Sequence, residues 1–235
     1  MSEAIVQSLP EGFHPVAMGG EHFCRKPLAG LPAPQACDLI DKLFSPDERF
    51  AKAFFKYWSD VLKHPENLAW KNTIEELETY ATALKNNLAD PYVYSVGYLT
   101  DEQEPESYVP VGIYAFRPLE DHQRGPEIIH VLDQMPSSEQ YEGRRSMMHT
   151  FSLLKDYRNL HMLKYIFVTV GFEALRQGYQ HIFFFMSDYR LKSVYKRYGL
   201  EFPENLKFED THHTIGVYSL TDANIAKIMA VINAS

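Results

Sequence analysis

Residues 149–163 read HTFSLLKDYRNLHML, and this stretch joins two elements that decide the fold. An apolar run ends at Leu154, the charged break KDYRN follows, and apolar residues then return at helical spacing. The pattern predicts the end of a strand, a short loop and the start of a helix. Because the break contains no glycine, side chains limit how closely another group can approach the loop backbone.

The sequence after this stretch alternates between helical and strand patterns. Apolar residues recur at helical spacing in the segments 160–178, 189–199 and 222–234. Short apolar or β-branched runs predict strands at 146–154, 180–187 and 212–220. Ser187 or Asp188 can cap the second helix, and Gly199 offers a left-handed exit from it. This order predicts a β-α-β-α unit.

The sequence before this stretch predicts helices first and strands afterwards. Helices are expected at 35–43, 45–62 and 72–84, and strands at 92–99, 109–118 and 127–135. Residues 1–34 are rich in Gly and Pro and are expected to be irregular, with one short strand at 21–25. We therefore expect an irregular extension over 1–34 and a single α/β domain over 35–235, built on a mixed sheet with helices on both faces.

Composition and charge narrow the function classes. A net charge of −8 argues against nucleic-acid binding, which needs a basic face, and a cationic or amine substrate would suit this charge. The two cysteines form no CxxC pair, which favours a reducing, cytoplasmic location over a zinc site or a disulfide scaffold. Neither a signal peptide nor an apolar run long enough to span a membrane is present.

Common hydrolase and metal motifs are missing. The sequence contains no GxSxG, HExxH or P-loop motif. Cys24 lies near two histidines in sequence, but neighbours in sequence rarely form a catalytic pair. His212 and His213 would point to opposite faces of a strand, which makes them poor ligands of one metal ion. We expect no metal.

Several motifs of the second half together resemble the GNAT superfamily of N-acyltransferases. They are VGIYAFRP at 111–118, SMMHTFSLLKDYR at 146–158, a helix ending RQGY at 176–179, HIFFFMSD at 181–188 and SVYKRYGLEF at 193–202. The order Tyr195-x-x-x-Gly199-x-x-Phe202 resembles the helix end of that family, with one extra residue before the aromatic. Arg158 precedes Gly178 at the spacing by which the family separates its phosphate-binding loop from the glycine that closes the next helix.

The resemblance implies where an acyl-CoA donor binds. The family carries an Arg/Gln-x-x-Gly-x-Gly/Ala loop, whose backbone N–H groups at a helix start bind the pyrophosphate of CoA. Here Arg158 is kept, but the glycine positions hold His161 and Leu163. The implied donors are the guanidinium of Arg158 and the amides of Asn159, Leu160, His161, Met162 and Leu163. A second match to the motif, residues 140–145, lies much further before Gly178.

The same resemblance implies catalytic and pantetheine-binding residues. His149 stands where arylalkylamine members carry a general base, although an inert core histidine is the alternative. Tyr195 matches the acid that protonates the leaving thiolate, although it lies on an apolar helix face. The edge of the strand at Phe151, Leu153 and Leu154 would bind pantetheine. Asp188 would contact pantetheine or simply cap the helix.

Further charged residues offer alternatives for these roles. Glu127 and Asp133 could act as bases through water, and Arg144 and Arg145 could reach the 3′-phosphate of CoA.

The resulting hypothesis is an acyl-CoA-dependent N-acyltransferase, with acetyl-CoA as the favoured donor and a primary amine of a small molecule or protein as the acceptor. A relative of acyl-homoserine lactone synthases, which take the acyl group from an acyl carrier protein, is one alternative. A non-catalytic binding protein on the same fold is the other, because bulky residues occupy both glycine positions. The C-terminal amphipathic helix could also serve a homodimer.

Overall fold

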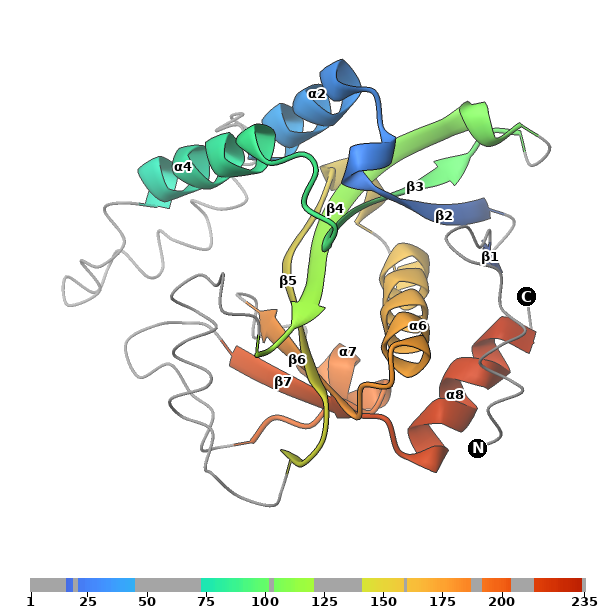
Figure 1. Cartoon of the computed structure of the whole chain (residues 1–235). Helices are drawn as coiled ribbons and strands as arrows, with labels where there is room; N and C mark the ends of the chain where they lie inside the picture. The colour runs from blue at the N-terminus through green and yellow to red at the C-terminus, as the bar shows by residue number, and fades with distance from the viewer. Residues whose placement is uncertain are drawn as a thin grey trace.

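A seven-stranded sheet forms the centre of the molecule (Figure 1). The computed structural model describes residues 16–18, 21–44, 73–101, 104–120, 141–158, 160–186, 192–203 and 214–233. The strands lie side by side in chain order: β1 (Val16–Met18), β2 (Glu21–Pro27), β3 (Val93–Leu99), β4 (Tyr108–Pro118), β5 (Arg145–Leu153), β6 (His181–Met186) and β7 (Thr214–Ser219). All neighbours are antiparallel except β5 and β6, which are parallel, so the sheet is mixed, as predicted.

Helices cover both faces of this sheet, as predicted (Figure 1). The α-helices are α2 (Ala33–Phe44), α4 (Thr73–Asn86), α6 (Leu160–Arg176), α7 (Lys192–Arg197) and α8 (Asp222–Asn233). Short 3-10 turns are η1 (Leu28–Gly30), η3 (Pro105–Ser107) and η5 (Lys155–Tyr157). No described helix is long and apolar enough to cross a bilayer.

The alternation of side chains along β4 shows how the two faces are filled. Ile113 and Ala115 are fully buried in the cluster formed with α2 and α4. Tyr114 and Phe116 are buried in the opposite cluster, which contains α6, α7 and α8 residues. Because successive side chains of a strand point to opposite faces, an almost continuously apolar strand is expected where both faces are covered.

Most predicted elements agree with the structure. The strands expected at 92–99, 109–118, 146–154, 180–187 and 212–220 correspond to β3–β7, and the helices expected at 35–43, 72–84 and 160–178 correspond to α2, α4 and α6. The helix from Ser45 and the strand at 127–135 lie outside the described residues. Within residues 1–34, the strand expected at 21–25 corresponds to β2. Strand β1 was not expected, because Gly and Pro residues obscure so short a strand, and both strands belong to the sheet.

A β-bulge in β5 changes which side chains share a face. Ile113 pairs with Ser152 and Ala115 with His149, so β5 spans the same length of β4 with one more residue. Gly112 makes this close pairing with β5 feasible. A Cβ atom at Gly112 would lie 2.4 Å from Leu153 Cδ2 and 2.7 Å from Ser152 O, and the second of these contacts is with backbone.

Strands β5 and β6 separate partway along their length. In the described part of the sheet they pair from Arg145 with His181 to Met148 with Phe184. Beyond that point β6 continues against β7 as far as Met186, and β5 continues against β4 as far as Leu153. A wedge therefore opens between the two parallel strands, and one edge of β5 faces it.

A buried ion pair joins the first half of the sheet to α6. Arg25 on β2 is 8% exposed and donates to Glu173 Oε2 at 2.5 Å and to the Tyr114 hydroxyl at 2.9 Å. Arg176 and Gln177 donate to Glu173 Oε1, both at 2.6 Å. Burial alone would raise the pKa of Glu173, but these donors and the positive charges lower it to about 2. The carboxylate thus stays ionised and fixes α6 on the sheet.

We predict that Gly112→Ala destabilises the protein by about 1–3 kcal/mol, because the added methyl group must displace the bulged backbone of β5. Chemical denaturation would measure this loss. Gly30→Ala is the matched control, because a Cβ atom there meets nothing within 4 Å, and its change should stay within about 0.5 kcal/mol. Equal stability of the two variants would show that β5 does not depend on Gly112.

Candidate functional site

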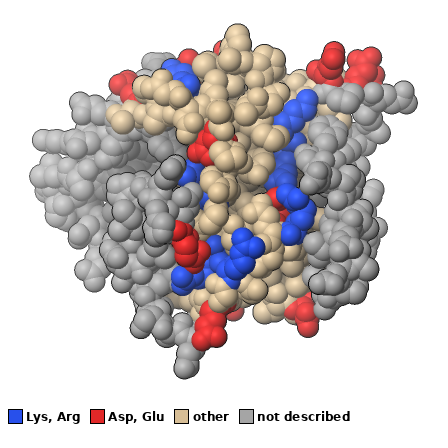
Figure 2. Space-filling view, viewed as in Figure 1, with Lys and Arg blue, Asp and Glu red and all other residues tan. Residues whose placement is uncertain are grey.

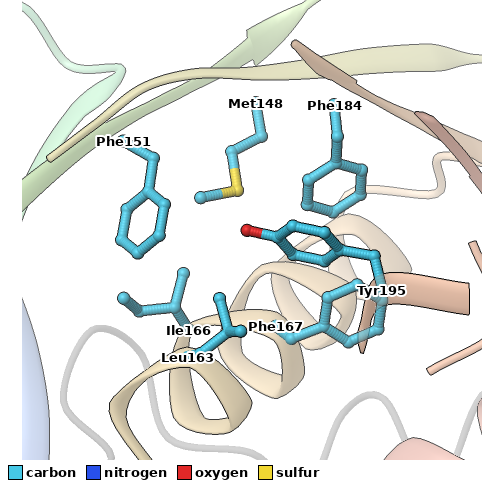
Figure 3. A pocket seen from close by; sticks show the side chains of 7 residues that line it. All are labelled: Met148, Phe151, Leu163, Ile166, Phe167, Phe184 and Tyr195. Carbon is cyan, nitrogen blue, oxygen red and sulfur yellow. The ribbon is translucent and has the colours of Figure 1, made fainter. Parts of the chain in front are cut away.

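An apolar pocket lies where β5 and β6 separate (Figure 3). Seven side chains line it: Met148 and Phe151 from β5, Phe184 from β6, Leu163, Ile166 and Phe167 from α6, and Tyr195 from α7. Its cavity volume is about 20 Å³. Leu163 and Phe151 are partly exposed, whereas the other five side chains are buried. The pocket thus has a mouth beside the first turns of α6 and a closed, aromatic end.

The bulge explains why two β5 residues that are three positions apart both line this pocket. Met148 and Phe151 are three positions apart and would point to opposite faces of a regular strand. The extra residue between His149 and Ser152 returns Phe151 to the face of Met148. Both side chains therefore lie opposite α6, where Figure 3 shows them.

The hydroxyl group of Tyr195 points into the pocket (Figure 3). Tyr195 lies in the short helix α7 and is 6% exposed. The chain leaves this helix through Gly199, which has a φ of 98°, and the N–H of Leu200 donates to the carbonyl of Tyr195 at 3.2 Å. The predicted left-handed exit at Gly199 is confirmed. It turns the chain back so that Tyr195 packs against α6 with its only polar side-chain atom toward the cavity.

The loop after β5 is anchored at both of its ends. Arg158 Nε donates to the carbonyl of Leu153 at 2.9 Å, which ties the start of α6 to the end of β5. The ring of Tyr157 packs against Tyr98 at 5.6 Å, and the two hydroxyl oxygens lie 3.2 Å apart. Partial burial lowers the pKa of Arg158 from its ordinary value. The guanidinium is therefore held at the N-terminal end of α6, where unpaired amides favour an anion.

The other residues predicted for cofactor binding are divided between surface and core. His161 is exposed, and Leu163 lines the pocket mouth. Met162 is fully buried, so only its backbone can face a ligand. Leu153 is buried in the core cluster that also contains the pocket residues, Leu154 is partly buried against the clusters on both faces of the sheet, and Leu160 begins α6. Asn159 and Asp188 lie outside the described residues.

His149 lies on the opposite face of the sheet from this pocket. It pairs with Ala115, and residues that pair across antiparallel strands share a face, here that of α2 and α4. Arg117 lies two positions further on the same face and forms an ion pair with Asp90 at 3.0 Å. Burial and the positive charge of Arg117, opposed by Asp90, lower the pKa of His149 to about 4. A free imidazole has a pKa near 6.5, so burial makes His149 a weaker base than an exposed histidine.

The alternative phosphate loop does not precede a helix. Residues 141–144 lead directly into β5, so no helix N-terminus follows them. Arg144 donates to the carbonyl of Gln177, and Arg145 pairs with Glu120 at 2.5 Å. Both arginines lie at the end of β5 away from the start of α6. Glu127 and Asp133 fall outside the described residues.

The structure brings Tyr195, Phe151 and Leu163 together and separates them from His149. It also adds four pocket residues that the sequence did not indicate: Met148, Ile166, Phe167 and Phe184. They look like ordinary core residues in the sequence, and only the separation of β5 and β6 gives them a cavity to face. Among the described residues no group of three or more His, Cys, Asp or Glu side chains could hold a metal ion.

Charged side chains of both signs are interspersed around the fold. On the face shown in Figure 2, Lys and Arg lie near Asp and Glu, with uncharged residues between them. Several cations are already paired, as Lys85 is with Asp41 at 2.7 Å. The described part of this face therefore shows no broad area of a single sign.

Comparison with known proteins identifies the fold. No protein-family model and no curated protein matches the sequence. An uncharacterized protein from Bacillus halodurans has a similar structure, with a TM-score of 0.60 and 10% identity over 95% of this chain and 97% of that one. A GNAT-family acetyltransferase from Streptococcus agalactiae matches with a TM-score of 0.50 and 9% identity, over 88% and 99% of the two chains. The chain has a GNAT-like fold, as the motifs predicted.

The pKa of His149 predicts a pH dependence of stability. This pKa is about 4 in the folded protein and near 6.5 in the unfolded chain. As the pH falls, the imidazole is therefore protonated in the unfolded chain before it is protonated in the folded protein. Stability from this group is complete above pH 6.5 and is lost as the pH falls toward 4. We expect His149→Gln to reduce the loss between pH 7 and 4.5 by about 2 kcal/mol, measured by urea denaturation.

His161→Gln is the matched control, because His161 is exposed at the start of α6. Its stability should follow the wild-type pH profile. An unchanged profile in His149→Gln would show that the imidazole is not held neutral by the fold.

Proposed function

We propose that this chain transfers an acyl group from acyl-CoA, with acetyl-CoA as the favoured donor, to a primary amine of a small molecule or a protein. The observation that carries the proposal is the wedge between β5 and β6, which joins an edge of β5 that no strand of the described residues pairs with to an apolar pocket containing the Tyr195 hydroxyl. The structural match to a GNAT-family acetyltransferase, which covers 88% of this chain, supports it. The two free cysteines, Cys24 and Cys37, are consistent with a cytoplasmic location.

The donor would bind along β5 and the start of α6. Beyond Met148, the edge of β5 that faces the wedge can hydrogen-bond the amides of a pantetheine arm, much as an added strand would. Arg158 and the first amides of α6 would hold the pyrophosphate. The residues at the two glycine positions are compatible with this role, because His161 is exposed and Leu163 turns into the pocket. Leu163 narrows the pocket mouth.

Tyr195 is proposed to protonate the leaving thiolate. In the reaction the amine nitrogen bonds to the thioester carbonyl carbon, the C–S bond breaks, and the sulfur takes up a proton. The Tyr195 hydroxyl is the only polar side-chain group among the seven pocket residues apart from the Met148 thioether, which carries no proton. It is therefore the proton donor that the pocket offers to a thiolate bound there.

His149 is proposed to assist on the amine side. It lies on the face covered by α2 and α4, so an amine that approaches the wedge from this face would meet it. With a pKa of about 4 the imidazole is neutral at neutral pH and can accept a hydrogen bond. The same low pKa makes it a weak base. The proposed role of His149 is therefore to orient the amine and to relay to solvent the proton that the amine loses.

We expect Tyr195→Phe to lower turnover of acetyl-CoA about 100-fold and to change acetyl-CoA affinity less than about twofold, because only proton transfer to sulfur is lost. Thiol release would be measured with a panel of amines: an arylalkylamine, a polyamine, a lysine peptide and a peptide with a free N-terminus. Calorimetry would give the affinity.

Tyr198→Phe is the matched control, because Tyr198 directly follows the same helix and its ring packs against Phe167 at 5.5 Å outside the pocket. It should keep wild-type turnover. Binding of acetyl-CoA without thiol release from any amine would instead support the non-catalytic alternative. Absence of any binding of CoA or acetyl-CoA would refute the proposed function.

A further inference from the structure

The closed end of the pocket is formed by a fixed aromatic pair. Phe184 and Phe167 stack with ring centroids 5.5 Å apart and an interplanar angle of 16°, and both are 5% exposed. Tyr218 packs edge-on against Phe167 at 4.7 Å, and Tyr198 contacts the same ring. Aromatic rings held by several such contacts cannot move aside without loss of packing. The floor of the pocket is therefore rigid.

The space above this floor is small. A cavity of about 20 Å³ exceeds the ~10–15 Å³ that a single water molecule needs, and it leaves room for one or two groups of that size. The mouth at Leu163 and Phe151 is the partly exposed side, next to the β5 edge and the start of α6. A ligand whose polar arm lies along that edge would enter with its apolar end toward Phe184.

We infer that the Phe167–Phe184 pair sets the length of the acyl group and restricts the donor to acyl groups of about two carbons. The inference rests on the proposed function, because it assigns the pocket to the acyl end of a CoA thioester. With the sulfur beside the Tyr195 hydroxyl, the acyl carbons have only the rest of this small cavity, which the Phe167 and Phe184 rings help to close. A longer chain would have to displace the stacked rings.

The test is a binding series on the full chain with CoA, acetyl-CoA, butanoyl-CoA and hexanoyl-CoA, measured by calorimetry. The wild-type protein should bind hexanoyl-CoA at least about tenfold more weakly than acetyl-CoA. Phe184→Leu removes part of the floor but keeps an apolar side chain. It should improve hexanoyl-CoA affinity about tenfold relative to acetyl-CoA and leave the affinity for CoA unchanged.

Phe116→Leu is the matched control, because Phe116 is 1% exposed in the same core and packs edge-on against Tyr179 outside the pocket. It should carry a similar stability cost and keep the wild-type chain-length preference. Phe167→Leu is a second variant of the floor if Phe184→Leu does not fold.

Each outcome of the binding series either supports or overturns the inference. It is overturned if the wild-type protein binds hexanoyl-CoA as tightly as acetyl-CoA, or if both floor variants keep the wild-type preference while CoA still binds. In that case the proposed function stands. Failure of CoA and of every thioester to bind the wild-type protein would instead remove the proposed function itself.

Discussion

The end of the β5–β6 pairing at Met148 and Phe184 is the constraint on which the candidate site depends. Backbone N–H and C=O groups need hydrogen-bond partners, and a strand edge without a neighbouring strand can obtain them from water or from a ligand. The wedge places such an edge beside an apolar pocket and beside the N-terminal end of α6. A ligand with an apolar end, peptide-like amides and an anionic group matches the pocket, the strand edge and the helix end, respectively.

A buried ion pair fixes one of the elements that surround the wedge. The ion pair between Arg25 and Glu173 links β2 to the last turns of α6, and its buried charges are satisfied by Tyr114, Arg176 and Gln177. A buried ion pair contributes little net stability, but losing one partner is costly, so it favours a single placement of the helix. Because α6 forms one wall of the pocket, this placement also sets the pocket width.

Sequence patterns predicted the helices and strands better than the way these elements pair and pack. Apolar periodicity located β3–β7 and α6, and the spacing of Tyr195 and Gly199 located a helix end whose side chain enters the pocket. The bulge that turns Phe151 toward Met148 left no recognisable pattern, because it depends on how β5 pairs with β4. The pKa of His149 was likewise hidden, because it depends on burial and on Arg117, which is distant in sequence.

Hydrogen–deuterium exchange with and without acetyl-CoA tests the central claim most directly, because it reports whether the open edge of β5 becomes paired. Segment 149–153 and the first turn of α6 should exchange more slowly when acetyl-CoA is present, whereas β2 and β3 should be unaffected. Slower exchange confined to other segments, or unchanged exchange at saturating acetyl-CoA, would contradict the account.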